Sequence, residues 1–85
     1  MKYYIGAIDE VNGGMEYSDR LLFATKGSPD KYMDKVAREW RGCTKADWDE
    51  SHGGYWSDCT LISAGYYKEI PKEDYDVLSK YLVVL

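Results

Sequence analysis

The stretch KYYIGAIDEVNGGMEYSDRLLFAT, residues 2–25, predicts a β-hairpin at the start of the chain. Tyr and Ile favour strands, so residues 2–9 are expected to form the first one. Asn12 and Gly13 form a strong turn signal, because both residues tolerate a positive φ. A second strand is expected over residues 16–25, polar in its outer half and apolar in its inner half. Both faces of the first strand are fairly apolar, so we expect it to lie centrally in a sheet.

Two helices are expected on either side of a third long strand. The first begins at Pro29 after Ser28, because a Ser hydroxyl accepts an orphan backbone N–H and proline suits the first helical position. Its apolar residues recur at helical spacing and form one stripe, Met33, Val36, Ala37 and Trp40. The second helix follows Pro71, and its apolar stripe comprises Tyr75, Leu78, Tyr81 and Leu82.

The order of elements predicts the fold class. The third long strand covers residues 59–70, with a β-bulge indicated at Gly65. The order β-β-α-β-α predicts one α+β domain over residues 1–85, with a three-stranded antiparallel sheet in the order 2-1-3. The sheet has four strands if Tyr55 and Trp56 begin a short strand before the third long one. Both helices are expected to pack on one face, which leaves the other face partly open.

The charge of the chain limits its partners. The sequence has 15 Asp and Glu against 11 Lys and Arg, a net charge of −4. This balance argues against direct binding to nucleic acid through a basic face and against binding to an anionic membrane. It favours a protein partner with a basic surface, although mild negative charge also keeps a small domain in solution.

The termini and the cysteines suggest a cellular setting. The N-terminus does not resemble a signal peptide, and no apolar run approaches the length of about 18 residues that spans a membrane. We therefore expect a cytoplasmic protein, in the cytoplasm of the host cell if a phage encodes it. Reducing conditions there favour free thiols at Cys43 and Cys59, and a disulfide between them remains the alternative.

The segment between these cysteines contains residue types that bind metals and catalyse reactions. Cys43, His52 and Cys59 are soft ligands, but their spacing lacks the short pairs of zinc sites, and the acids between them lack the calcium-loop spacing. A Cys–His dyad here carries none of the local signatures of cysteine enzymes. We therefore expect no metal, no cofactor and no catalytic residue.

The same segment fits a protein-binding surface better. Aromatic anchors ringed by charge are typical of interfaces, and here tryptophan and tyrosine alternate with acids. The alternative is that these aromatic side chains cover the open end of the core. The predicted partner-binding residues are Asp47, Trp48, Asp49, Glu50, Tyr55, Trp56 and Asp58.

Over its whole length the chain resembles the small anti-defence proteins of phages and plasmids, the anti-CRISPR and antirestriction proteins. The features that carry the resemblance are its size, its acidity, its Tyr- and Trp-rich acidic loop and its lack of a catalytic motif. The resemblance implies a non-enzymatic inhibitor that binds a nucleic-acid-binding complex of the host through an acidic, aromatic-rich surface. It also implies that the residues of the loop make the contact.

Two other functions remain open on the sequence. One is a homo-oligomeric structural or regulatory domain, a homodimer for example, that associates through the open sheet face and the apolar tail, residues 83–85. That tail could instead pack under the sheet or add an edge strand. The other is a small cysteine-dependent enzyme built on Cys59 or His52.

Overall fold

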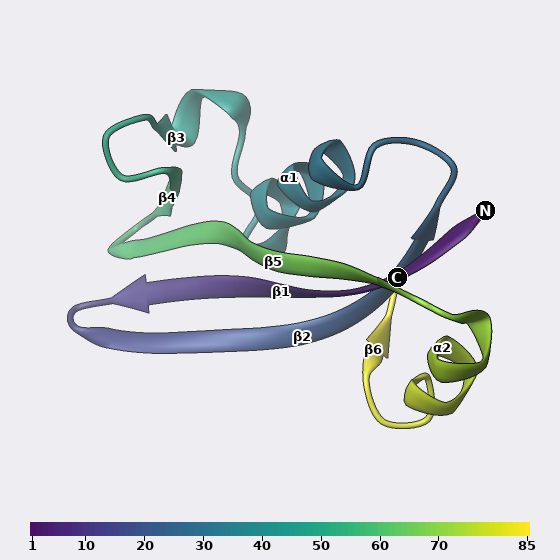
Figure 1. Cartoon of the computed structure of the whole chain (residues 1–85). Helices are drawn as coiled ribbons and strands as arrows, with labels where there is room; N and C mark the ends of the chain where they lie inside the picture. The colour runs from purple at the N-terminus through teal and green to yellow at the C-terminus, as the bar shows by residue number, and fades with distance from the viewer.

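The chain forms an α+β fold around one sheet, and the computed structural model describes all of residues 1–85 (Figure 1). A 3₁₀ turn, Lys45–Asp47, lies between the first helix and the third strand. In chain order, the strands and helices are β1 (Lys2–Asn12), β2 (Met15–Thr25), α1 (Pro29–Trp40), β3 (Trp48–Asp49), β4 (Gly54–Ser57), β5 (Thr60–Ile70), α2 (Lys72–Leu78) and β6 (Val83–Val84).

The sheet has six strands in the order β3-β4-β5-β1-β2-β6. It is mixed, because β6 runs parallel to β2 while the other neighbours are antiparallel. The prediction of a three- or four-stranded antiparallel sheet in the order 2-1-3 is therefore wrong. The predicted order omits β3 and β6, which have two residues each, too few to show an alternation of polar and apolar side chains. The alternative that the tail adds an edge strand is confirmed, because β6 pairs with β2 at the edge of the sheet.

A two-residue loop sets the register of the hairpin. Gly13 and Gly14 have φ angles of 56° and 88°, in the region that favours glycine. Asn12 consequently pairs with Met15, and the pairing continues without interruption along both strands. The hairpin expected from residues 2–25 is present, and its first strand is longer than expected, because it continues to Asn12.

The two helices lie on opposite faces of the sheet, above and below it in Figure 1. α1 packs on the face that contains Gly6, where a Cβ on that glycine would lie 2.9 Å from Cε of Met33. α2 packs on the other face, where Tyr75 lies against Tyr3 with ring centroids 4.8 Å apart. Odd and even residues of a strand point to opposite faces. The expectation that both helices cover one face is therefore wrong.

Most of the core lies between α1 and the sheet. Phe23 stacks between Tyr4 and Tyr32, with ring centroids 5.0 and 4.6 Å apart. On the opposite face Ala7 and Leu22 are fully buried as well. β1 and β2 are apolar on both faces at the end of the sheet away from the hairpin turn. Both faces must therefore be shielded from water there, and α1 packs on one while α2 packs on the other. The core cluster comprises Tyr4, Ile8, Leu21, Phe23, Met33, Ala37, Tyr55 and Ile62.

The ends of α1 agree with the sequence, and the end of α2 does not. The Ser28 hydroxyl accepts a hydrogen bond from the backbone N–H of Lys31 at 3.4 Å, and Gly42 follows the helix with a φ of 71°. α2 ends at Leu78, so the last turn of its expected apolar stripe is absent. Tyr81 is accordingly 78 % exposed.

A buried carboxylate ties the end of α1 to β1. Glu10 is the only buried charged residue, with 3 % of its surface exposed. Arg41, just after α1, donates to its Oε2 from Nη2 at 2.6 Å and from Nε at 3.0 Å. A carboxylate shielded from water needs a charged partner, so this pair holds the C-terminal end of α1 over the hairpin half of the sheet.

Gly6→Ala is expected to lower the free energy of unfolding by about 1–3 kcal/mol, because the new methyl group overlaps the Met33 side chain. Urea unfolding followed by tryptophan fluorescence measures the change. Gly27→Ala is the matched control, since its Cβ would meet only Thr25 Oγ1 at 3.7 Å, and it is expected to change stability by less than about 0.5 kcal/mol. Equal effects of the two substitutions would contradict the close approach of α1 to β1.

Candidate functional site

The segment 43–58 is ordered largely by its own carboxylates. Asp47 accepts hydrogen bonds from the backbone N–H and the hydroxyl of Thr44, at 2.7 and 3.3 Å, and so caps the 3₁₀ turn. Asp58 adopts a φ of 53° in the turn between β4 and β5, a conformation that Asp tolerates better than most residues. These two predicted partner-binding residues therefore have roles in the turns of the chain.

The Asp49 carboxylate holds the loop between β3 and β4 together. Its Oδ1 accepts from the backbone N–H and the hydroxyl of Ser51, at 3.0 and 2.7 Å. Its Oδ2 accepts from Trp56 Nε1 at 2.8 Å and lies 2.9 Å from His52 Nδ1. The bonds from Ser51, then Trp56 and His52, hold the pKa of Asp49 well below its usual range. The charged carboxylate thus fixes the loop and orients the Trp56 ring.

The predicted aromatic anchors do not lie on one surface. Trp48 pairs with Tyr55 across β3 and β4, and their rings meet edge-on at 5.0 Å. Trp56 is the next residue of β4, so it points to the opposite face. Trp48 and Trp56 are 42 % and 37 % exposed. The two tryptophan rings are therefore exposed on opposite faces of the sheet.

Tyr55 and Glu50, two other predicted residues, differ in their exposure. Tyr55 is 4 % exposed and donates its hydroxyl proton to Asp34 at 2.8 Å, so it belongs to the core. Burial, and then this bond to Asp34, raises the pKa of Tyr55. Glu50 is exposed and accepts a hydrogen bond from Trp48 Nε1 at 2.7 Å. Of the predicted surface, the Trp48–Glu50 pair, Trp56 and Asp58 remain exposed, and the two tryptophans lie on opposite faces of the sheet.

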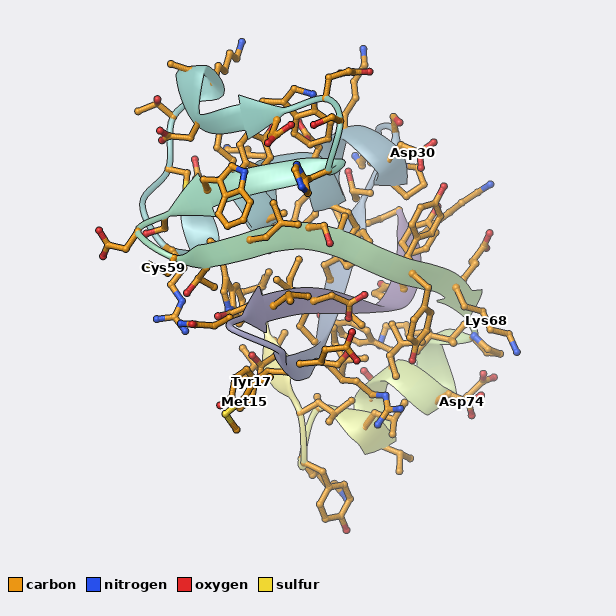
Figure 2. The ribbon with its side chains drawn as sticks, turned by 90° about the vertical axis from the view of Figure 1, so that its left-hand side faces the viewer. Met15, Tyr17, Asp30, Cys59, Lys68 and Asp74 are labelled. Carbon is orange, nitrogen blue, oxygen red and sulfur yellow. The ribbon has the colours of Figure 1, made fainter.

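The face opposite α1 contains a groove at the hairpin end, the end turned toward the viewer in Figure 2. It crosses β5, β1 and β2, where Asp9 lies between Ser63 on one side and Ser18 on the other. Its volume is about 470 Å³. The residues that line it are Asp9, Glu10, Val11, Glu16, Tyr17, Ser18, His52, Leu61 and Ser63.

The groove is acidic. Two acids, Asp9 and Glu16, direct their side chains to this face, and no Lys or Arg lines the groove. Glu10 directs its carboxylate to the α1 face, where Arg41 pairs with it, whereas Asp9 and Glu16 form no ion pair within the chain. Asp9 accepts a hydrogen bond from the Ser18 hydroxyl at 2.9 Å. Its carboxylate fills the space beside Gly65, where a Cβ would lie 2.6 Å from Oδ2.

A hydrogen bond separates the groove from the end of this face that α2 covers. Arg20 Nε donates to the Tyr66 hydroxyl at 3.2 Å, which joins β2 to β5 across β1. β5 has one extra residue here, because Gly6 pairs with Tyr67 while Ile8 pairs with Ala64. The bulge expected at Gly65 is thus confirmed. The open part of the face is limited to the hairpin end.

The thiols and the histidine do not assemble into a metal centre. Cys43 and Cys59 are free thiols, and no group of three or more His, Cys, Asp and Glu side chains is arranged to hold a metal ion. The Cys43 Sγ donates to the Trp56 carbonyl oxygen at 3.5 Å. Burial, and then the charge of Asp47, raises the pKa of Cys43, so its thiolate is disfavoured at neutral pH.

Comparisons with known proteins add nothing to this geometry. No protein-family model, curated protein or solved structure matches the chain. Neither helix has the length and apolar character that crossing a bilayer requires. The groove and its surroundings are therefore the features that bear on function.

The groove residues of the hairpin were not among the candidates from the sequence, although the register that the turn imposes places them on one face. A two-residue loop at Gly13 and Gly14 makes Asp9 the partner of Ser18 and Val11 the partner of Glu16. Side chains of directly paired residues lie on the same face. Reading the hairpin in this register would have placed these four side chains together, but not beside β5.

Asp49→Asn is expected to lower the melting temperature at neutral pH and to flatten its decrease in acid. The pKa of Asp49 is lower in the folded than in the unfolded protein, so the carboxylate stabilises the fold above the unfolded value of about 4. That stabilisation is lost progressively as the pH falls below this value. Thermal unfolding followed by near-ultraviolet circular dichroism, between about pH 2 and about pH 7, measures both effects.

Asp74→Asn serves as the control, because Asp74 is an exposed residue of α2 without a side-chain hydrogen bond. It should follow the acid dependence of the unmodified protein. An Asp49→Asn variant with that same dependence would contradict the role given to the Asp49 carboxylate.

Proposed function

We propose that this protein is a non-enzymatic binding protein that docks on a basic surface of a protein partner through the acidic groove. The observation that carries the proposal is the charge of the groove: the carboxylates of Asp9 and Glu16 share its face, no Lys or Arg lines it, and no helix covers it. A lysine or arginine that enters it meets Asp9 and Glu16, whose charges are not neutralised within the chain. Such a local field of one sign guides an oppositely charged partner into place.

Apolar side chains beside these charges supply contact area. Val11 is 38 % exposed and lies in the groove with Leu61. Trp56 meets His52, which also lines the groove, edge-on at 5.7 Å between ring centroids. Tryptophan is among the residues that contribute most to protein–protein affinity, especially where polar groups surround it. In this proposal Trp56 is the aromatic anchor, and Trp48 lies outside the interface.

The resemblance to anti-CRISPR and antirestriction proteins supports a nucleic-acid-binding defence complex as the partner. Such a complex holds the phosphate backbone with Lys and Arg, and a protein that occupies those side chains inhibits it. The proposed contact is local, because the unpaired acids of the groove are few. The protein would dock at one basic position and need not imitate the length of a DNA duplex.

A photo-crosslinking amino acid at position 11 tests this proposal in a lysate of the encoding organism or its host. Crosslinking is expected to capture a nucleic-acid-binding protein, and added double-stranded DNA or structured RNA should compete with it. The same crosslinker at position 35, on the exposed side of α1, is the control and should not capture that protein. Equal capture at both positions, or capture that nucleic acid does not reduce, would contradict the proposal.

The captured partner, once purified, allows a charge test. Asp9→Asn combined with Glu16→Gln removes both unpaired charges of the groove and is expected to weaken binding by about tenfold or more. Glu39→Gln combined with Asp74→Asn removes the same two kinds of charge from exposed helical positions and should change the affinity by less than about threefold. Isothermal titration calorimetry measures both, and equal losses would show that only the net charge matters.

The two tryptophans give a second comparison with the same partner. Trp56→Ala is expected to weaken binding by at least about tenfold, because it removes the anchor next to the groove. Trp48→Ala removes a ring of similar exposure from the other face and should leave the affinity within about threefold. A larger loss for Trp48→Ala would place the interface on the α1 side of the sheet.

A further inference from the structure

The outer edge of β2 is unpaired over its first half. β1 pairs with the whole of β2, whereas β6 pairs with it only at Leu21 and Leu22. Residues 15–20 therefore have no neighbouring strand on the outer side. This segment contains no proline, lysine or bulge, which are common means of preventing edge-to-edge pairing.

The backbone groups that point outward can be assigned. The Leu22 carbonyl oxygen accepts from the Leu85 N–H at 2.9 Å, so Leu22 directs its backbone groups away from β1. Alternate residues of a strand direct their N–H and C=O groups to the same side. Glu16, Ser18 and Arg20 therefore present one donor and one acceptor each along the free edge.

We propose that two copies of this chain form a symmetric dimer in which residues 16–20 of β2 pair antiparallel with the same residues of the second copy, centred on Ser18. A two-fold axis through Ser18 places Glu16 directly opposite Arg20 of the partner, at both ends of the ladder. Opposite charges at directly paired positions stabilise an antiparallel pair. The sequence of this edge is thus complementary to itself, as a two-fold interface requires.

Ser18 is also the centre that the surrounding structure favours. A centre at Tyr17 would pair Glu16 with Ser18 and Arg20 with Gly14, which leaves both charges without a partner. With the centre at Ser18, the ladder ends at Arg20, just before β6 begins to pair at Leu21. The second copy leaves the ladder at Met15, next to its own turn at residues 13–14.

Two exposed apolar side chains lie next to this edge. Met15 and Tyr17 are 60 % and 52 % exposed, and the Tyr17 hydroxyl donates to the Met15 sulfur at 3.6 Å. Figure 2 shows both at the hairpin end of β2. In the dimer the two Tyr17 rings lie diagonally across the ladder, within reach of each other, because aromatic side chains span such diagonal positions.

The guanidinium of Arg20 is available for this contact. Its Nε is the atom that bonds to Tyr66, and its Nη groups have no hydrogen bond within the chain. Glu16 has no ion pair either. The antiparallel arrangement also puts the grooves of both copies on one face of a continuous sheet, since paired residues share a face. The dimer does not depend on the proposed function: it pairs Glu16 with Arg20 of the second copy, so in the dimer Asp9 alone keeps its charge unpaired in each groove, and a basic partner competes with the second copy for Glu16.

Sedimentation equilibrium of the purified protein, from micromolar to millimolar concentration, tests the dimer. We expect a weak dimer that dissociates on dilution, because a five-residue ladder is small for a stable interface. Glu16→Arg alone and Arg20→Glu alone each place like charges opposite each other and should weaken the dimer by about tenfold or more. The equimolar mixture of these two variants restores both attractive pairs, so it should form a heterodimer of about the unmodified affinity.

The double variant Glu16→Arg/Arg20→Glu is the second control, because it exchanges the charges and keeps both pairs. It should dimerise as the unmodified protein does, which also shows that the substitutions permit folding. A protein that remains monomeric at millimolar concentration would overturn the proposal. So would a dimer whose affinity the single variants leave unchanged, since that dimer must use another surface.

Discussion

One central strand has to be covered on both faces, and the rest of the structure depends on this constraint. β1 pairs with β5 on one edge and β2 on the other, and its apolar side chains point to both faces. α1 covers one face, with Met33 against Gly6, and the Arg41–Glu10 pair extends that contact toward the hairpin. α2 covers the far end of the other face, where Tyr75 meets Tyr3. No element covers the hairpin end of that face, and its polar side chains form the groove.

Two sets of acids in this chain have different electrostatic roles. Asp47 and Asp49 in the segment 43–58 are bonded to nearby hydroxyl and N–H groups, so their charge stabilises turns and orients Trp56. Asp9 and Glu16 are held on regular strands and form no ion pair. Charge that the fold does not use remains available to a partner. This difference is why the proposed interface lies on the hairpin and not in the acidic loop.

The sequence predicts the elements with strong local signals and misses those that depend on tertiary contacts. The hairpin, the start of α1 at Ser28 and the bulge at Gly65 follow from turn, cap and glycine patterns. The short strands β3 and β6 exist only because longer strands lie beside them, so no periodicity reveals them. The composition of the aromatic, acidic loop predicted a binding surface there. Composition does not show that Trp48 and Trp56 point to opposite faces of the sheet. The groove joins residues from three strands and a loop, and that assembly requires the register.

Chemical-shift mapping by NMR tests the central claim, that the acidic groove is the surface that receives a basic partner. The uniformly ¹⁵N-labelled protein is titrated with a short arginine-rich peptide at low ionic strength. If the groove receives the peptide, the largest amide shifts occur at residues 9–11, 16–18 and 61–63, and added salt reverses them. Largest shifts at Asp47 and Glu50, or at Asp30 and Asp34 on α1, would contradict it.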